Sequence, residues 1–217
     1  KRGYYQNIKD DNTQLELVLN MVKANNLVEN SIFIYASDHG ISGKWGVAEQ
    51  GLRVPFVVRW PGVVNPNSVS ESLLNFVDVL PTFLDIIGAK IPSDIDGKSF
   101  QATLKGSQAP VHDYIYSIST RQNIQACKIF PSRAVRGKRY KFIRNYNSME
   151  VVASNYGNNP AVNAFIRIGA ESFPNIPFEE LYDLENDPYQ KNNLIKNNDL
   201  SWYLYRYGEP SLEKNAR

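Results

Sequence analysis

The spacing of hydrophobic residues predicts helices and strands that alternate in the first half of the chain. Apolar positions recur at helical spacing over residues 4–25, which is typical of an amphipathic helix. The continuous apolar run at 32–36 is rich in β-branched and aromatic residues and predicts a strand covered on both faces. A second strand is expected over 52–60, and a helix over 78–87 with Asp78 as its cap. This alternation indicates an α/β layer.

The second half of the chain predicts a different, mostly antiparallel unit. Residues 134–143 predict two strands around a glycine-containing turn, and residues 180–184 predict a further short strand. Residues 147–177 are rich in Asn, Gly and Pro and are expected to form a long excursion. We therefore expect an α/β part over residues 1–110 and a smaller antiparallel β subdomain over residues 111–217.

Polar residues follow directly on the 32–36 strand, in the order Asp38, His39, Gly40. Ligands in open α/β sheets gather just beyond the carboxyl ends of strands, so this placement suggests a metal or anion site. Lys44 comes five residues after His39 in a glycine-flanked segment, where backbone and ammonium group could both approach a tetrahedral oxyanion. Taken alone, the Asp-His-Gly sequence also fits an ordinary turn, and Lys44 also fits a solvated surface lysine.

Composition narrows the function classes only modestly. The chain has 217 residues, of which 42% are hydrophobic and 21% charged, as in an ordinary globular protein. A net charge of +2 gives no case for nucleic acid or an anionic membrane as partner. No apolar run approaches the roughly 20 residues of a membrane span. The single cysteine, Cys127, excludes an internal disulfide framework. Because no methionine precedes the first helical residues, we expect a processed or truncated chain.

Several stretches resemble the type I sulfatases, which belong to the alkaline-phosphatase-like superfamily. The second signature region of that family is similar to SDHG, a Gly-Lys-x-Gly element and EQGLRVPFVVRWPG. Later family segments are similar, in the same order, to LNFVDVLPTFLDIIG, IDGKSFQATLKG, SRAVRGKRYKFIRNYN and EELYDLENDPYQKNNL. Within the family, STRQNIQACKIFPSRAVR resembles the N-sulfoglucosamine sulfohydrolase (heparan N-sulfatase) branch. The implied fold is the carboxyl-terminal part of an α/β sheet domain plus a small antiparallel β subdomain with a helix.

The resemblance implies roles for the residues beyond the first strand. Asp38 would be a carboxylate ligand of Ca²⁺, a cation that prefers hard oxygen donors. His39 occupies a neighbouring position that faces both metal and sulfate; because imidazole is a poorer Ca²⁺ ligand, its role stays open between the two. Lys44 would contact the sulfate oxygens. Arg53 is expected to brace the segment.

Other candidate residues lie in the second half of the chain. Arg121 and Arg133 are candidates for shaping the substrate pocket, although the basic run over 133–144 alternates with apolar residues and predicts a solvent-facing strand pair. His112 is expected to be structural or solvated. Cys127 is expected to be inert.

The implied activity is hydrolysis of sulfate esters or N-sulfate groups on glycosaminoglycan-type sugars. The family's nucleophile is a formylglycine that matures from a C/S-x-P-x-R signature in the amino-terminal half, and this chain lacks that signature. Around Cys127 the proline comes four residues after the cysteine, at Pro131, where the signature requires two. We therefore expect an amino-terminal portion as partner, no activity from this chain alone, and a periplasmic, secreted or lysosomal location.

Two alternatives remain open from the sequence. One is a phosphodiesterase or phosphonate hydrolase of the same superfamily, although such relatives use paired transition metals and only one Asp-His pair is present here. The other is a non-catalytic module that binds anionic glycans. A C/S-x-P-x-R signature immediately upstream would decide between these classes.

Overall fold

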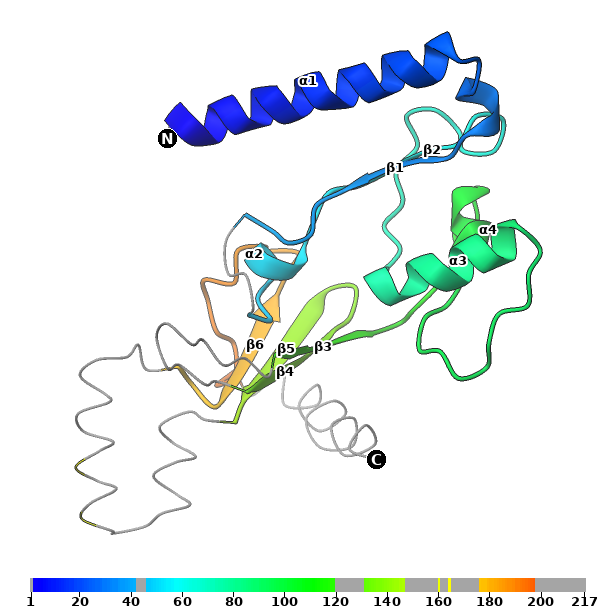
Figure 1. Ribbon diagram of the computed structural model, residues 1–217. Helices are drawn as coiled ribbons and strands as arrows, with labels where there is room; N and C mark the ends of the chain where they lie inside the picture. Colours follow the sequence, from blue (N-terminus) through cyan, green and yellow to red (C-terminus); the bar gives the residue numbers. More distant parts are fainter. Residues whose placement is uncertain are drawn as a thin grey trace.

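The computed structural model describes two sheets joined by short helices (Figure 1). One sheet has two strands in the order β1-β2, and the other has four in the order β3-β4-β5-β6. The described residues are 2–41, 46–119, 131–146 and 176–197, together with the single positions Pro160 and Ala164.

Helix α1 (Arg2–Ala24) confirms the helix predicted from the apolar spacing. It ends at Asn25 and Asn26, and Asn26 adopts a left-handed φ of 56°, a conformation that asparagine tolerates better than most residues. Figure 1 shows α1 at one end of the molecule, beside the two-stranded sheet and away from the four-stranded one. Most of its apolar side chains are exposed in this chain, among them Tyr5, Ile8, Leu17, Val18 and Met21.

Strands β1 (Phe33–Ala36) and β2 (Phe56–Arg59) pair antiparallel, with Ala36 opposite Phe56. The prediction that the first strand is covered on both faces is wrong within the described chain, because Tyr35 is 47% exposed and Val57 on β2 is 58% exposed. The second strand begins at Phe56 instead of residue 52. Residues Glu49–Leu52 form the short helix α2, and Pro55, which has no N–H for the ladder, precedes the strand.

The third helix confirms the prediction for residues 78–87. Helix α3 (Val79–Ile86) follows a 3₁₀ turn, η2 (Phe76–Asp78), and ends before Gly88, whose φ is +68°. Asp78 stands at the N-cap position, but its carboxylate accepts the N–H of Asn75 and so completes the capping box of η2. Helix α4 (Gln101–Leu104) comes next along the chain.

The four-stranded sheet confirms the antiparallel unit predicted for the second half. Every neighbouring pair of strands in it is antiparallel, and the predicted hairpin and the strand near residue 180 are both present. Its first strand was not predicted. The strands are β3 (Ile115–Ser119), β4 (Ser132–Arg136), β5 (Tyr140–Asn145) and β6 (Glu179–Asp183).

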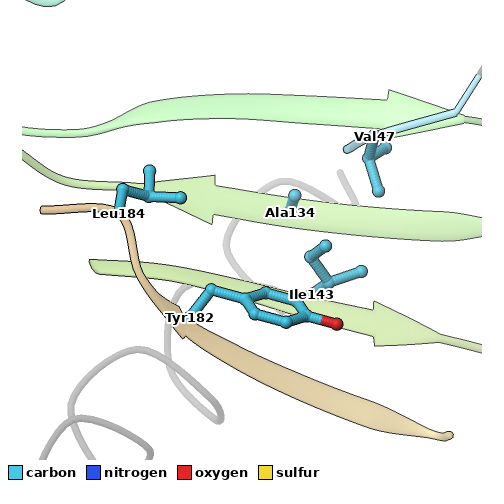
Figure 2. Packing of buried hydrophobic residues seen from close by; sticks show 5 residues of the cluster. All are labelled: Val47, Ala134, Ile143, Tyr182 and Leu184. Carbon is cyan, nitrogen blue, oxygen red and sulfur yellow. The ribbon is translucent and has the colours of Figure 1, made fainter. Parts of the chain in front are cut away.

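Both faces of this sheet are covered over β4, β5 and β6, where side chains alternate between the faces and both sets are buried or half-buried. Val135, Phe142 and Leu181 form a cluster on one face. The other face carries the second cluster, in which Val47, from the segment that leads into α2, packs against the strands (Figure 2). Its members are Val47, Ala134, Ile143, Tyr182 and Leu184.

Among the helices of the described part of the chain, we find none with the length and apolar character needed to cross a membrane.

Candidate functional site

A turn of three residues, Ser37 to His39, follows β1 and carries the predicted acid and imidazole. The N–H of Ser37 donates to the carbonyl of Pro55 at 3.4 Å, which continues the pairing with β2, and its hydroxyl donates to the carbonyl of His39 at 2.7 Å. The side chain of Asp38 is 76% exposed. The structure therefore brings Asp38 and His39 together at the carboxyl end of β1, with the carboxylate accessible to a ligand.

The ring of His39 is oriented by its own backbone. Its Nδ1 lies 2.7 Å from the carbonyl oxygen of Gly40, and because a carbonyl only accepts, Nδ1 carries the proton. Its Nε2 lies 3.5 Å from Oδ1 of Asp38. In the neutral ring Nε2 offers a lone pair beside the carboxylate, so the two groups could share a cation. In the protonated ring Nε2 donates to the carboxylate instead.

Gly40 fixes this turn against helix α2. Its N–H donates to the carbonyl of Gly51 at 2.9 Å. The approach is so close that a Cβ at position 40 would lie 2.1 Å from the carbonyl oxygen of Gln50. Only glycine allows the two backbone segments to pack in this way.

Helix α2 is anchored by a buried acid, Glu49. Its carboxylate lies 2.7 Å from Nζ of Lys141 on β5 and 3.2 Å from Nε of Arg136 on β4. Its backbone N–H donates to Oε1 of Gln190. Lys141 is 1% exposed and Glu49 7% exposed, so the four-stranded sheet holds α2 through buried charges.

Burial and pairing act in opposite directions on these two groups. Burial alone would raise the pKa of Glu49, but the charges and hydrogen bonds of Lys141 and Arg136 outweigh it and hold that pKa below its ordinary value. For Lys141 burial is the strongest influence and lowers the pKa, although Glu49 offsets part of the effect.

Three predicted residues lie outside the described part of the chain: Lys44, Arg121 and Cys127. Their predicted roles stay predictions. Arg133 is described and lies on β4, with its guanidinium over the ring of Tyr146 at 5.4 Å from the centroid. Arg53 stands just after α2, where its backbone N–H caps the helix by donating to the carbonyl of Glu49 at 2.8 Å, while its side chain is exposed. The brace predicted for Arg53 is thus made by its backbone.

The prediction that the basic run over 133–144 marks a solvent face is wrong. Strand alternation places Arg133 and Arg144 on one face, and Arg136 and Lys141 on the other, which α2 covers. Arg144 is itself paired with Glu179 at 2.6 Å. The four basic side chains therefore belong to two buried or half-buried networks.

Sequence reasoning missed the anchoring role of Glu49 and Lys141. Both are charged, and charged residues are almost never fully buried unless they are paired. The pairing joins residues that are far apart in the sequence, so no local pattern could reveal it. The one available signal was the position of Glu49 at the start of the EQGLRVP stretch.

His112 confirms the structural interpretation. Its Nε2 lies 2.9 Å from Oδ1 of Asp78, a residue with no exposed surface. The pair belongs to the packing around α3, where Asp78 also accepts the N–H of Lys98 at 2.8 Å.

Comparison with known proteins supports the family predicted from sequence. The family model described as N-sulphoglucosamine sulphohydrolase, C-terminal, matches residues 37–161, more than half of the chain. A protein named ulvan-active sulfatase, from Formosa agariphila, is 53% identical over 92% of this chain and 40% of its own length. An N-acetylglucosamine-6-O-sulfatase from Bacteroides thetaiotaomicron is 25% identical over 89% of this chain and 32% of its own. The chain thus spans two fifths or less of these relatives.

Solved structures confirm the predicted fold class. A protein solved with its substrate D-glucosamine-2-N,6-O-disulfate superposes with a TM-score of 0.71 at 23% identity, over 92% of this chain and 37% of that one. The phosphonate monoester hydrolase of Agrobacterium radiobacter gives a TM-score of 0.67 at 21% identity, over 93% and 38%. At these identities the similarity shows the fold alone. With the family-model match and the 53% identical sulfatase, the chain belongs to the type I sulfatases and corresponds to their carboxyl-terminal portion.

Proposed function

We propose that the complete protein hydrolyses sulfate groups on a sulfated polysaccharide and that this chain supplies one wall of the active site. The observation that carries the proposal is the Asp38–His39 pair, held at the carboxyl end of β1 within the segment that the family model matches. The opposite wall, with the formylglycine nucleophile, would come from an amino-terminal portion of the enzyme.

Asp38 fits a calcium ligand, because its carboxylate is a hard oxygen donor and its side chain is 76% exposed. Calcium takes six to eight oxygen ligands, and the described residues include no cluster of three or more potential metal-binding side chains. As the family resemblance implies, further ligands would come from the amino-terminal portion. A bound calcium ion would offset negative charge on the sulfate oxygens.

Lys44 is proposed to act on the sulfate, and His39 on the sulfate or on the metal. Lys44 would place its ammonium on the sulfate oxygens as a point charge. His39, whose Nε2 faces the Asp38 carboxylate, would contact either the metal or the sulfate. Arg133, and Arg121 in the preceding segment, are candidates for contacts to the sugar.

We propose ulvan as the first candidate substrate. The supporting relative, 53% identical over 92% of this chain, is named an ulvan-active sulfatase. The second candidate is a glycosaminoglycan-type sugar with N-sulfate groups, which the family-model description and the glucosamine disulfate complex support. Phosphonate or phosphodiester hydrolysis is supported by the shared fold alone. We propose a periplasmic, secreted or lysosomal location, as the family resemblance implies.

Exposed apolar side chains support the proposal that an amino-terminal portion packs on this chain. Large apolar side chains are exposed on helix α1, on strands β1 and β2, and around helix α3. Such surfaces usually mark an interface. The relatives are long enough to supply the cover, since this chain matches 40% or less of their length. The groups are Tyr5, Ile8, Leu17, Val18 and Met21 on α1, Tyr35 and Val57 on β1 and β2, and Leu80, Phe83 and Ile87 around α3.

The test compares the complete enzyme with this chain alone, with sulfate release from ulvan and heparin-type oligosaccharides as the measurement. We expect release from the complete enzyme and none from the isolated chain. Asp38→Ala and Lys44→Ala in the complete enzyme should abolish release, and Asp94→Ala, which removes an exposed carboxylate elsewhere, should not.

Three results would contradict the proposal. Sulfate release by the isolated chain would show that no amino-terminal wall is needed. Two zinc ions in the complete enzyme, with turnover of a phosphonate ester, would indicate the other branch of the superfamily. Glycan binding without hydrolysis, unaffected by Asp38→Ala and Lys44→Ala, would indicate a binding module.

A further inference from the structure

Three side chains form a buried charge cluster away from the candidate catalytic groups. The cluster consists of Glu49 with Lys141 and Arg136, and we call it the charge clamp. Glu49 Oε1 lies 2.7 Å from Lys141 Nζ, and Glu49 Oε2 lies 3.2 Å from Arg136 Nε. Each basic residue therefore holds a different oxygen of one carboxylate, which fixes both the position and the rotation of that group.

The clamp is connected to the Asp38–His39 turn by a short series of backbone hydrogen bonds. Glu49 is the first residue of α2, and its carbonyl accepts the N–H of Arg53 at 2.8 Å, which closes the helix. The carbonyl of Gly51, in the same helix, accepts the N–H of Gly40 at 2.9 Å. Movement of α2 would therefore carry Gly40 with it, and Gly40 directly follows His39.

Two further contacts hold the same segment on the sheet. Gln190 Oε1 accepts the backbone N–H of Glu49, and Val47 packs into the apolar cluster on the same face (Figure 2). The segment from Val47 to Leu52 is thus held by side chains of the four-stranded sheet and of the residues after it. The turn with Asp38 contacts the same segment through the hydrogen bond between Gly40 and Gly51.

We propose that the charge clamp positions the Asp38–His39 turn for the reaction, so that Glu49 is a positioning residue which acts through Gly51 and Gly40. This inference rests on the proposed function. It assigns to the antiparallel subdomain a part in the active site, although none of its described residues is a predicted metal or sulfate ligand and only Arg133 is a candidate for contact with the sugar. The antiparallel sheet then supports, through α2, the turn that carries Asp38 and His39.

The energetics of buried charges favour this interpretation over a purely stabilising role. Desolvation offsets most of the attraction within a buried ion pair, so apolar residues of similar size often give equal or greater stability. What the charged arrangement adds is direction, because a carboxylate held at both oxygens has one allowed orientation. Groups that must be placed to a fraction of an ångström in a catalytic site depend on such fixed supports.

The test uses the complete enzyme and three variants. Glu49→Gln removes the charge but keeps the shape, and Lys141→Met removes one partner while Arg136 remains. The matched control is Asp183→Asn, which breaks the 2.8 Å pair with Arg139 on the other face of the same sheet. For each protein, kcat and KM for sulfate release from ulvan oligosaccharides, the melting temperature, and hydrogen exchange of peptides covering residues 37–41 are measured.

We expect Glu49→Gln and Lys141→Met to lower kcat/KM about 100-fold, the loss typical of a misplacement near 1 Å, and to speed exchange at residues 37–41. Asp183→Asn should lower the melting temperature without either effect. If Glu49→Gln does not fold, Lys141→Met decides, since it leaves Arg136 on the carboxylate.

Separate outcomes identify which proposal fails. A clamp variant that lowers the melting temperature, but leaves kcat/KM and exchange at 37–41 unchanged, overturns the positioning role. If the unaltered complete enzyme releases no sulfate, the proposed function fails. The exchange measurement then still decides whether the clamp holds the turn, because it requires no substrate.

Discussion

The contact between His112 and Asp78 joins the segment before β3 to the start of helix α3. Nε2 of His112 lies 2.9 Å from one carboxylate oxygen of Asp78 and 3.0 Å from the other. The same carboxylate accepts the backbone N–H groups of Asn75 at 2.7 Å and Lys98 at 2.8 Å. One fully buried acid therefore satisfies three donors from three segments, so its loss would leave all three unpaired.

Asp78→Ala is expected to destabilise the protein by about 3 kcal/mol, because each buried donor left without an acceptor costs on the order of 1–3 kcal/mol. Asp78→Asn keeps one acceptor oxygen and should cost less. His112→Gln, which can still donate, should cost least. Urea unfolding of the complete enzyme would give this order. A midpoint for Asp78→Ala equal to that of the unaltered protein would contradict it.

Gly40→Ala is expected to impair the site more than the fold. Its Cβ would lie 2.1 Å from the backbone oxygen of Gln50, so the turn with Asp38 must shift away from α2. Overpacking of this kind costs about 1–3 kcal/mol, whereas a shift near 1 Å costs about 100-fold in rate. The measurements are kcat/KM and the urea midpoint of the complete enzyme.

Gly3→Ala is the matched control for that substitution. Nothing lies within 4 Å of a Cβ at this helical position, so the same change should leave activity intact. It should add up to about 1 kcal/mol of stability, as alanine does in place of glycine in a helix. Equal activity of the two variants would show that the contact between Gly40 and Gln50 is not needed.

The sequence was sufficient to predict the elements whose signal is local. Apolar spacing located α1, the capping signal at Asp78 located α3, and the strands around a glycine-containing turn located the β4–β5 hairpin. The start of β2 was misplaced because Leu52 ends helix α2 and Pro55, which has no N–H for the ladder, precedes the strand. The contacts of Glu49 with Lys141 and Gln190, which hold α2 on the sheet, join residues far apart in the sequence and leave no local pattern.

The candidate site was predictable only in part, for the same reason. Asp38 and His39 stand beside each other in the chain and at the end of an apolar run, so both their proximity and their location follow from the sequence. Glu49 and Lys141 are 92 residues apart, and their pairing depends on how the sheet folds back on α2. No local pattern marks Lys141, and the position of Glu49 at the start of the EQGLRVP stretch does not reveal its partner.

Val18→Asp is expected to weaken the attachment of the amino-terminal portion. Val18 is 44% exposed on α1 in this chain, and full burial of a valine contributes about 1.5–3 kcal/mol. A charge at that position should lower the affinity of the separately produced portions at least about tenfold, since 1.4 kcal/mol is a factor of ten. Isothermal titration calorimetry measures this affinity. Glu16→Gln, a polar change on the same helix, is the control, and equal affinities would argue that α1 lies outside the interface.

Asp183 gives the protein a component of stability that depends on pH in the acid range. Hydrogen bonds from Arg139 hold its pKa down, from an ordinary value of 3.8 to about 2, and Asn186 and the N–H of Glu185 contribute, although burial opposes them. A carboxyl whose pKa is lower in the folded state adds stability above its ordinary pKa. That stability is lost as the pH falls from about 4 to about 2.

Asp183→Asn removes that component, so the difference in unfolding midpoint between the variant and the unaltered protein should vary with pH. At pH 6 the variant should unfold at a lower urea concentration than the unaltered protein. The difference should shrink below pH 4 and disappear only below about pH 2, where Asp183 becomes protonated in the folded state as well. A difference that stays constant from pH 6 to pH 2 would mean that the ionised Asp183 carboxylate contributes nothing through Arg139, and that the variant acts only through its neutral hydrogen bonds.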